Sequence, residues 1–139
     1  MRNYFTLPEL LRSELAKKMG IDNFPSFEVV HNLEQLRDKV LNPLREAYGA
    51  KIAVTSGYRC PRLNAAVNGA VSSQHMLGQA ADIRAIVAEP QNLFAENRRL
   101  FELVQELKLP FDQLINEYNF SWLHVSFSPR HRRQILNVM

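Results

Sequence analysis

The order in which helical and strand-like hydrophobic patterns follow one another most restricts the fold of this chain. Thr6 and Glu9 form a capping box that begins a helix, and Gly20 is typical of its end. Leucines at helical spacing predict a second helix over residues 33–48, capped by Asn32. Pro43 lies inside this second helix, so we expect a kink or break there.

The rest of the chain predicts short strands separated by loops and two more helices. The strands are expected at residues 51–55, 79–84, 111–118 and 121–128, with an Asn119-Phe120 turn between the last two. A short helix is expected at residues 61–67, and a long one begins at Pro90, has Phe94, Phe101, Val104 and Leu107 at core spacing, and ends before Pro110. The pattern predicts an α+β domain with helices packed on one side of a small, mostly antiparallel sheet.

Length and composition exclude several classes of protein. The 139 residues fit one domain, residues 1–139, and 46% hydrophobic residues suffice for a core. One cysteine allows neither an intramolecular disulfide nor a thiolate-only zinc site. No apolar run approaches the roughly 20 residues of a membrane span, and the N-terminus lacks a signal-peptide pattern. We expect a monomer that is cytoplasmic as made and does not bind nucleic acid, with residues 130–133 a solvated basic tail.

Residues 72–83, SSQHMLGQAADI, place a glycine and two alanines between His75 and Asp82. Such small residues permit close approach of backbone and ligand. If residues 79–84 form a strand, Asp82 faces away from Ala81 and Ile83 and so lies outside the apolar layer.

Residues 122–127, WLHVSF, alternate in the same way. Leu123, Val125 and Phe127 make a core face, which leaves His124 on the polar face. With His75 and Asp82, His124 completes a set of two imidazoles and one carboxylate, as in catalytic zinc sites that keep a fourth position open. A histidine on a strand is more often a surface or hydrogen-bonded core residue, so the spacing alone leaves both interpretations open.

Three motifs occur in order: S-G-Y-R at 56–59, S-x-H-x-x-G-x-A-x-D at 73–82 and W-x-H at 122–124. Over roughly residues 52–127, this series resembles the zinc D-alanyl-D-alanine carboxypeptidase family and the related phage endolysin peptidases, which cleave peptidoglycan stem peptides. The related hedgehog signalling domain shares this architecture. The resemblance therefore implies a hedgehog-like fold and a zinc metallopeptidase.

The resemblance also implies roles for particular residues. His75, Asp82 and His124 match the ligands of a single Zn²⁺, Arg59 matches an arginine that holds and polarises the substrate, and Ser73 matches a serine that contacts it. A guanidinium can bind a carboxylate or carbonyl oxygen through two parallel hydrogen bonds, which a lysine cannot reproduce. The alternatives are a surface ion pair for Arg59 and a turn cap for Ser73. Tyr58 and Trp122 line a substrate cleft or pack in the core.

The general base is where the chain departs from this family. Much of the family has an acidic residue three positions before the last ligand histidine, but here that position is Ser121. Glu117 on the preceding strand is our candidate, because a subset of the family has a similar Q-L-I-x-E segment; Asp112 is a second choice. Cys60 lacks a nucleophile signature, and solvent-facing roles are expected for His31 and His131.

These observations lead to one expected function and one alternative. The first is a zinc-dependent peptidase that hydrolyses short peptidoglycan stem peptides at or near a D-amino acid, either like a D-Ala-D-Ala carboxypeptidase or like an endolysin released to the cell wall. The alternative is a catalytically inactive, zinc-containing module of the same fold that binds the cell wall or a protein. Ser121 at the usual acidic position supports this alternative.

Overall fold

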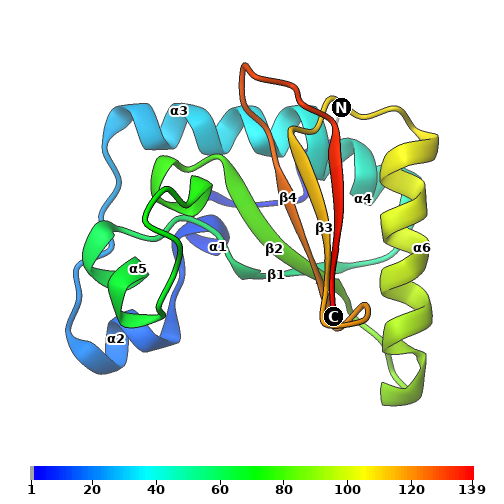
Figure 1. Ribbon diagram of the computed structural model, residues 1–139, viewed down its shortest axis with the longest axis horizontal. Coiled ribbons are helices and arrows are strands. Elements are labelled where there is room, and N and C mark those ends of the chain that lie inside the picture. Colours follow the sequence, from blue (N-terminus) through cyan, green and yellow to red (C-terminus); the bar gives the residue numbers. More distant parts are fainter. Residues whose placement is uncertain (1) are drawn as a thin grey trace.

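A computed structural model describes residues 2–139 of the protein. A five-stranded sheet forms its centre (Figure 1). The strands are β1 (Ile52–Ser56), β2 (Ala80–Ala85), β3 (Gln113–Glu117), β4 (Trp122–Ser126) and β5 (Gln134–Val138). Their order in the sheet is β1-β2-β4-β3-β5, and only β3 and β5 pair in parallel. The predicted α+β class with a mostly antiparallel sheet is confirmed.

Helices cover one face of this sheet, where the core lies (Figure 1). The helical elements among residues 2–139 are α1 (Leu7–Leu11), α2 (Glu14–Met19), α3 (Phe27–Leu36), the π-helix η1 (Arg37–Leu41), α4 (Asn42–Tyr48), α5 (Pro61–Ala66), the 3₁₀-helices η2 (Gln74–Leu77) and η3 (Pro90–Asn92), and α6 (Leu93–Glu106). Helix α6 contacts α4, β2 and β4. Ile83 and Leu123 are fully buried in this core, so strand alternation directs Asp82 and His124 to the opposite face.

The N-terminal helical segment consists of two helices, not one. The predicted capping box is confirmed, and Gly20 ends α2 in the left-handed conformation with φ +64°. The single helix that we expected is wrong, because the backbone is extended at Arg12 and the Ser13 hydroxyl accepts a hydrogen bond from the Ala16 N–H, which begins α2.

The second helix begins earlier than its leucine pattern predicts. Ser26 caps α3, while Asn32 lies inside the helix and donates a hydrogen bond to the Leu77 carbonyl. Of the kink or break that we expected at Pro43, the break is wrong, because η1 precedes the proline. In this π-helix the Asn42 N–H donates to the Arg37 carbonyl, five residues back, so α4 continues from α3 without interruption.

Helix α6 exposes two residues that we expected in the core. Phe101 and Val104 are buried as predicted, but the exposed fraction is 54% for Phe94 and 39% for Leu107. Asn97 is fully buried on the core-facing side of α6. Its side chain accepts a hydrogen bond from the Ala85 N–H and donates to the Phe120 carbonyl. The helix therefore turns a polar residue inward, which its hydrophobic periodicity does not reveal.

The C-terminal region is a strand and its connection, not a tail, although residues 130–133 are exposed as expected. Strand β5 pairs along β3, and in the preceding connection Arg132 binds the buried Asp112. The side chains of β5 are exposed, and the strand is held by backbone pairing with β3. Burial therefore does not impose on β5 the alternation of polar and apolar residues by which a strand is recognised in a sequence. Within residues 2–139, no helix combines the length and apolarity needed to cross a bilayer.

Candidate metal centre and cleft

Three side chains converge on the face of the sheet that the helices leave uncovered. Asp82 on β2 and His124 on β4 are direct cross-strand partners, and His75 comes from η2, just before β2. The Asp82 Oδ1 lies 3.3 Å from His75 Nε2 and 3.2 Å from His124 Nδ1. One possible ligand atom from each residue lies within 4.8 Å of the others, so the three could hold a metal ion.

The orientation of His75 is fixed by a backbone carbonyl. Its ring is buried, and Nδ1 lies 2.7 Å from the Gly57 oxygen. Because a carbonyl oxygen only accepts hydrogen bonds, Nδ1 carries a proton, and Nε2 is the ring nitrogen that faces Asp82 and can bind a metal ion. A backbone contact that fixes the tautomer of a histidine in this way is common at metal sites.

The donor set fits a divalent cation. When Nε2 of His75 carries no proton, its lone pair and the carboxylate oxygen of Asp82 face each other at 3.3 Å, which is unfavourable unless one cation binds both atoms. Burial opposes ionisation of Asp82, but hydrogen bonds from His124 and His75 outweigh it and hold the pKa of this carboxyl below its usual range. Two nitrogens and one carboxylate oxygen are ligands that zinc prefers.

The Gly57 carbonyl orients His75, and replacing Gly57 tests how tightly this segment packs against the Leu10 backbone. A Cβ at this position would lie 2.1 Å from the Leu10 carbonyl oxygen, so the segment that contacts His75 would have to move. We expect Gly57→Ala to lower the free energy of unfolding by about 1–3 kcal/mol, measured by urea denaturation. Gly49→Ala is the control, because a Cβ there meets open space and only the left-handed backbone is strained. A loss no greater than in this control would contradict the packing argument.

The three side chains open onto a cleft of about 570 Å³. Its walls include four more residues that the sequence analysis selected, namely Arg59, Ser73, Glu117 and Trp122. Tyr58 does not line it, because its side chain is only 7% exposed and packs in the hydrophobic core. For Tyr58, the structure therefore favours the packing alternative over contact with a substrate.

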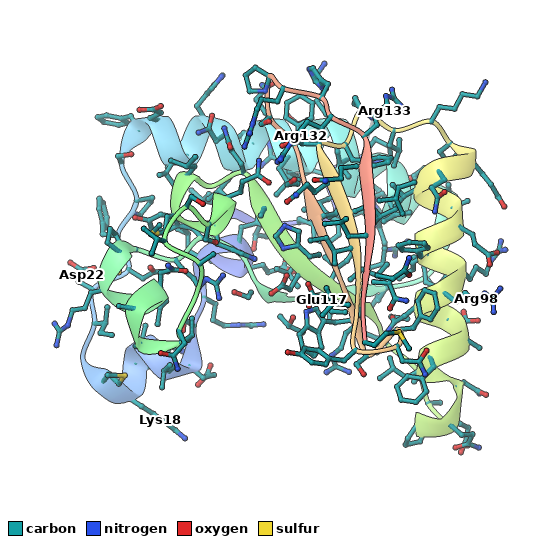
Figure 2. All side chains as sticks on the ribbon, viewed as in Figure 1. Lys18, Asp22, Arg98, Glu117, Arg132 and Arg133 are labelled. Carbon is teal, nitrogen blue, oxygen red and sulfur yellow. The ribbon has the colours of Figure 1, made fainter. Side chains whose placement is uncertain are left out.

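Glu117 lies in this cleft at the end of β3 near the β3–β4 turn (Figure 2). It pairs with Trp122, two positions along the sheet from the pair Ile115 and His124. Burial and the nearby charge of Asp82 raise the pKa of Glu117, while His124 and His75 partly offset this rise. Ser121 does not line the cleft, and its hydroxyl donates a hydrogen bond to the Tyr118 carbonyl within the turn.

Arg59 and Ser73 lie together on another wall of the cleft. The Arg59 guanidinium donates a 3.4 Å hydrogen bond to the Ser73 hydroxyl, and its buried Nε has no hydrogen-bond partner in the described part of the chain. Burial lowers the pKa of Arg59, and the charge of Asp82 partly offsets this. Among residues 2–139 no ion pair satisfies Arg59, so the alternative of a surface ion pair does not hold. Ser73 also caps η2 by accepting from the His75 N–H.

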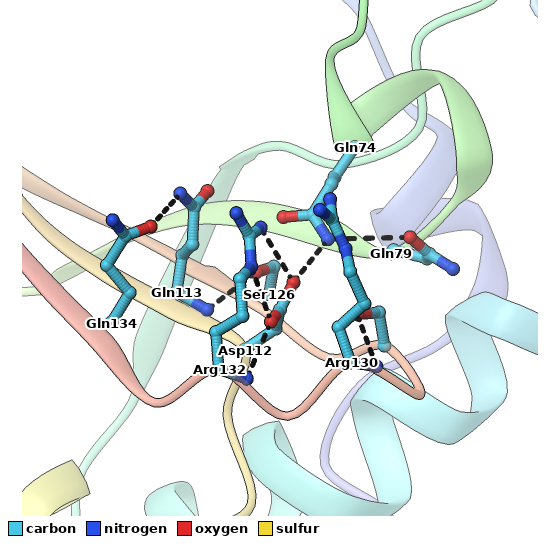
Figure 3. A network of polar contacts seen from close by, with 9 residues as sticks. Gln74, Gln79, Asp112, Gln113, Ser126, Arg130, Arg132 and Gln134 are labelled. Atoms are coloured by element: carbon cyan, nitrogen blue, oxygen red, sulfur yellow. Dashed lines mark hydrogen bonds and ion pairs between the residues drawn. The ribbon is translucent and has the colours of Figure 1, made fainter.

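Asp112, our second choice of base, is fully buried and already satisfied (Figure 3). Arg132 donates to both of its oxygens at 2.9 Å, and Gln74 donates to Oδ2 at 2.8 Å. The Arg132 side chain holds the pKa of Asp112 below its usual range. The cleft walls do not include Cys60, His31 or His131.

Gln74, Arg130 and Arg132 are among the cleft-lining residues that the sequence analysis did not select. The two arginines come from the connection that we expected to be a solvated tail. No local pattern places this connection beside the cleft, since its position depends on the pairing of β5 with β3. Gln74 lies between two motif residues and carries no signal of its own.

The geometry agrees with the comparison to known proteins. No curated protein matches the chain, but the family model described as Peptidase M15 matches residues 3–126, which is most of its length. The matched residues contain the three side chains that could hold a metal ion, in a family of zinc-dependent peptidases. By this match, supported by a donor set that suits zinc, the chain belongs to the Peptidase M15 family.

Proposed function

We propose that this protein is a zinc peptidase that hydrolyses short peptidoglycan stem peptides at or next to a D-amino acid. The observation that carries the proposal is that a His-Asp-His donor set, a partly buried glutamate and an arginine without an ion-pair partner all face one cleft. All of these residues come from one chain, which is consistent with a monomer as the active unit.

His75, Asp82 and His124 would hold one zinc ion in this cleft. When bound, zinc supplies Lewis acidity, which activates water and polarises a carbonyl oxygen. Glu117 lines the same cleft, and we assign it the role of general base. It takes a proton from the attacking water and passes it to the leaving amine. Its raised pKa suits this exchange, because such a carboxyl takes up a proton more readily than one in water.

Arg59 and Ser73 bind and orient the substrate in this mechanism. The unpartnered Nε of Arg59 and its planar guanidinium can donate to a substrate carbonyl or carboxylate oxygen. The Ser73 hydroxyl, beside Arg59, can hydrogen-bond to the peptide backbone. Trp122 provides an aromatic wall at the Glu117 end of the cleft.

Product analysis on defined stereoisomers tests the function. The zinc-loaded protein is incubated with a stem pentapeptide that ends in D-Ala-D-Ala and with its all-L diastereomer, and products are identified by mass spectrometry. We expect hydrolysis of the natural isomer only, with the product masses showing which bond is cut. Comparable cleavage of the all-L peptide would refute the D-amino acid preference.

The alternative of an inactive zinc-containing binding module rests on Ser121, which replaces an acid and does not reach the cleft. Bound zinc together with saturable binding of stem peptides, but no hydrolysis of any of them, would support this module. Hydrolysis that depends on Glu117 would exclude it.

For Arg59→Lys, we expect zinc binding to persist and kcat/KM to fall by about 10- to 100-fold. The substitution retains the positive charge but loses the planar pair of donors, and hydrogen bonds to charged groups contribute about 1.5–3 kcal/mol. The measurement is steady-state hydrolysis together with zinc content. Arg62→Lys is the control, because Arg62 does not line the cleft. Unchanged kinetics for Arg59→Lys would remove Arg59 from the site.

A further inference from the structure

The C-terminal segment adds to the cleft a wall that lies beyond the family match. The match ends at residue 126, whereas Arg130 and Arg132 belong to the connection that follows β4. Strand β5 then pairs along the whole length of β3. The connection is therefore held at the Gln113 end of the cleft, and Glu117 and Trp122 lie at the other end.

The connection is anchored by Asp112. This buried carboxylate accepts hydrogen bonds from the backbone N–H and the side chain of Arg132. The charge of Arg132 is thus compensated. Arg130, two residues earlier, is exposed and lines the cleft, and it has no ion-pair partner among residues 2–139. The segment consequently presents one uncompensated positive charge to the cleft.

Gln74 provides a buried acceptor in the same part of the cleft. The residue is 7% exposed, and its Nε2 donates to Asp112 Oδ2 at 2.8 Å. Because a carboxylate only accepts hydrogen bonds, this contact fixes which end of the amide is the nitrogen. The amide oxygen is then the other end, and it is buried with no hydrogen-bond partner from residues 2–139. In Figure 3 the Arg130 side chain extends from the connection toward Gln74.

We propose that Arg130 and Gln74 form a subsite for a substrate residue that carries a free carboxylate and a neighbouring N–H group. Arg130 pairs with the carboxylate, and the Gln74 oxygen accepts from the N–H. Among residues 2–139, Arg59 and Arg130 are the cleft arginines outside any ion pair; Arg59 lies beside Ser73 on another wall, so Arg130 is the group at this end that can pair with a carboxylate. The proposal rests on the proposed peptidase function, of which it specifies the substrate class.

The register of the sheet places this subsite relative to the cut bond. His124 pairs with Ile115, and Gln113 lies two residues further along β3. At about 3.4 Å per residue, Gln113 is roughly 7 Å from the metal centre along the strand, which is about two residues of an extended peptide. The recognised carboxylate therefore belongs to a residue about two positions from the scissile bond.

Two stem pentapeptides ending in D-Ala-D-Ala test this subsite. Their third residue is diaminopimelate, with its side-chain carboxylate either free or converted to a carboxamide. We expect the wild-type protein to prefer the carboxylate probe by about tenfold or more in kcat/KM, as a charge-assisted hydrogen bond would give. Arg130→Gln should lose most of this preference. Arg133→Gln is the matched control, because Arg133 lies in the same connection but does not line the cleft, and it should retain the preference (Figure 2).

Equilibrium binding separates failure of the subsite from failure of the peptidase function. The same probes are titrated by calorimetry into zinc-loaded Glu117→Gln protein, with and without Arg130→Gln. A tenfold difference in Kd that depends on Arg130 would support the subsite even if neither probe were cleaved. Equal affinity for the two probes, or a preference that persists in Arg130→Gln, would overturn it.

Discussion

Glu117→Gln is expected to reduce the kcat of stem-peptide hydrolysis by roughly 10²–10⁴-fold, the range over which general acid–base catalysis operates. The amide has nearly the shape of the carboxylate but cannot take a proton from water. Glu117 is not among the three side chains that could hold the metal ion, so zinc content should remain at that of the wild type. Steady-state hydrolysis and metal analysis by mass spectrometry measure kcat and zinc content on the same sample.

Glu89→Gln is the matched control for this substitution. Glu89 is an exposed acid outside the cleft, so the same change there should leave kcat unaltered. If Glu117→Gln kept more than about a tenth of the wild-type kcat, Glu117 would not be the base, since even the low end of the catalytic range would be missing.

His124→Ala is expected to reduce zinc from about one equivalent per chain to almost none and to abolish hydrolysis with it. Two donors, His75 and Asp82, would remain from a set of three, too few for a catalytic zinc site. The fold should survive, because His124 lies on the face of β4 opposite the core. In chelator, we expect the free energy of unfolding to change by at most about 1 kcal/mol.

His31→Ala controls for the loss of a histidine as such. His31 lies on α3, away from the cleft, so this variant should keep a full equivalent of zinc. A full zinc equivalent in His124→Ala would instead show that His124 is not a ligand. Loss of zinc accompanied by global unfolding in chelator would show that His124 is mainly structural.

The strands that carry the site could be predicted because their signal is local. Alternation along β4 buries Leu123 and Val125 and directs His124 to the other face, as expected, and the same rule holds for Asp82 on β2. Helix boundaries were less predictable. The expected start of α3, a break at Pro43 and the single N-terminal helix were wrong, because caps and a π-helix influence the backbone together with the hydrophobic pattern.

By itself, then, the sequence determined the α+β class, the faces of the strands and the residues from which a metal site could be made. The tertiary structure alone decided that Asp82 and His124 are cross-strand partners, that Gly57 orients His75, and that β5 brings Arg130 to the cleft. These contacts join residues distant in the chain, and each depends on backbone groups: strand pairing for Asp82, His124 and β5, and the Gly57 carbonyl for His75. Backbone groups are the same in every residue except proline, so residue identities do not encode which partners will meet.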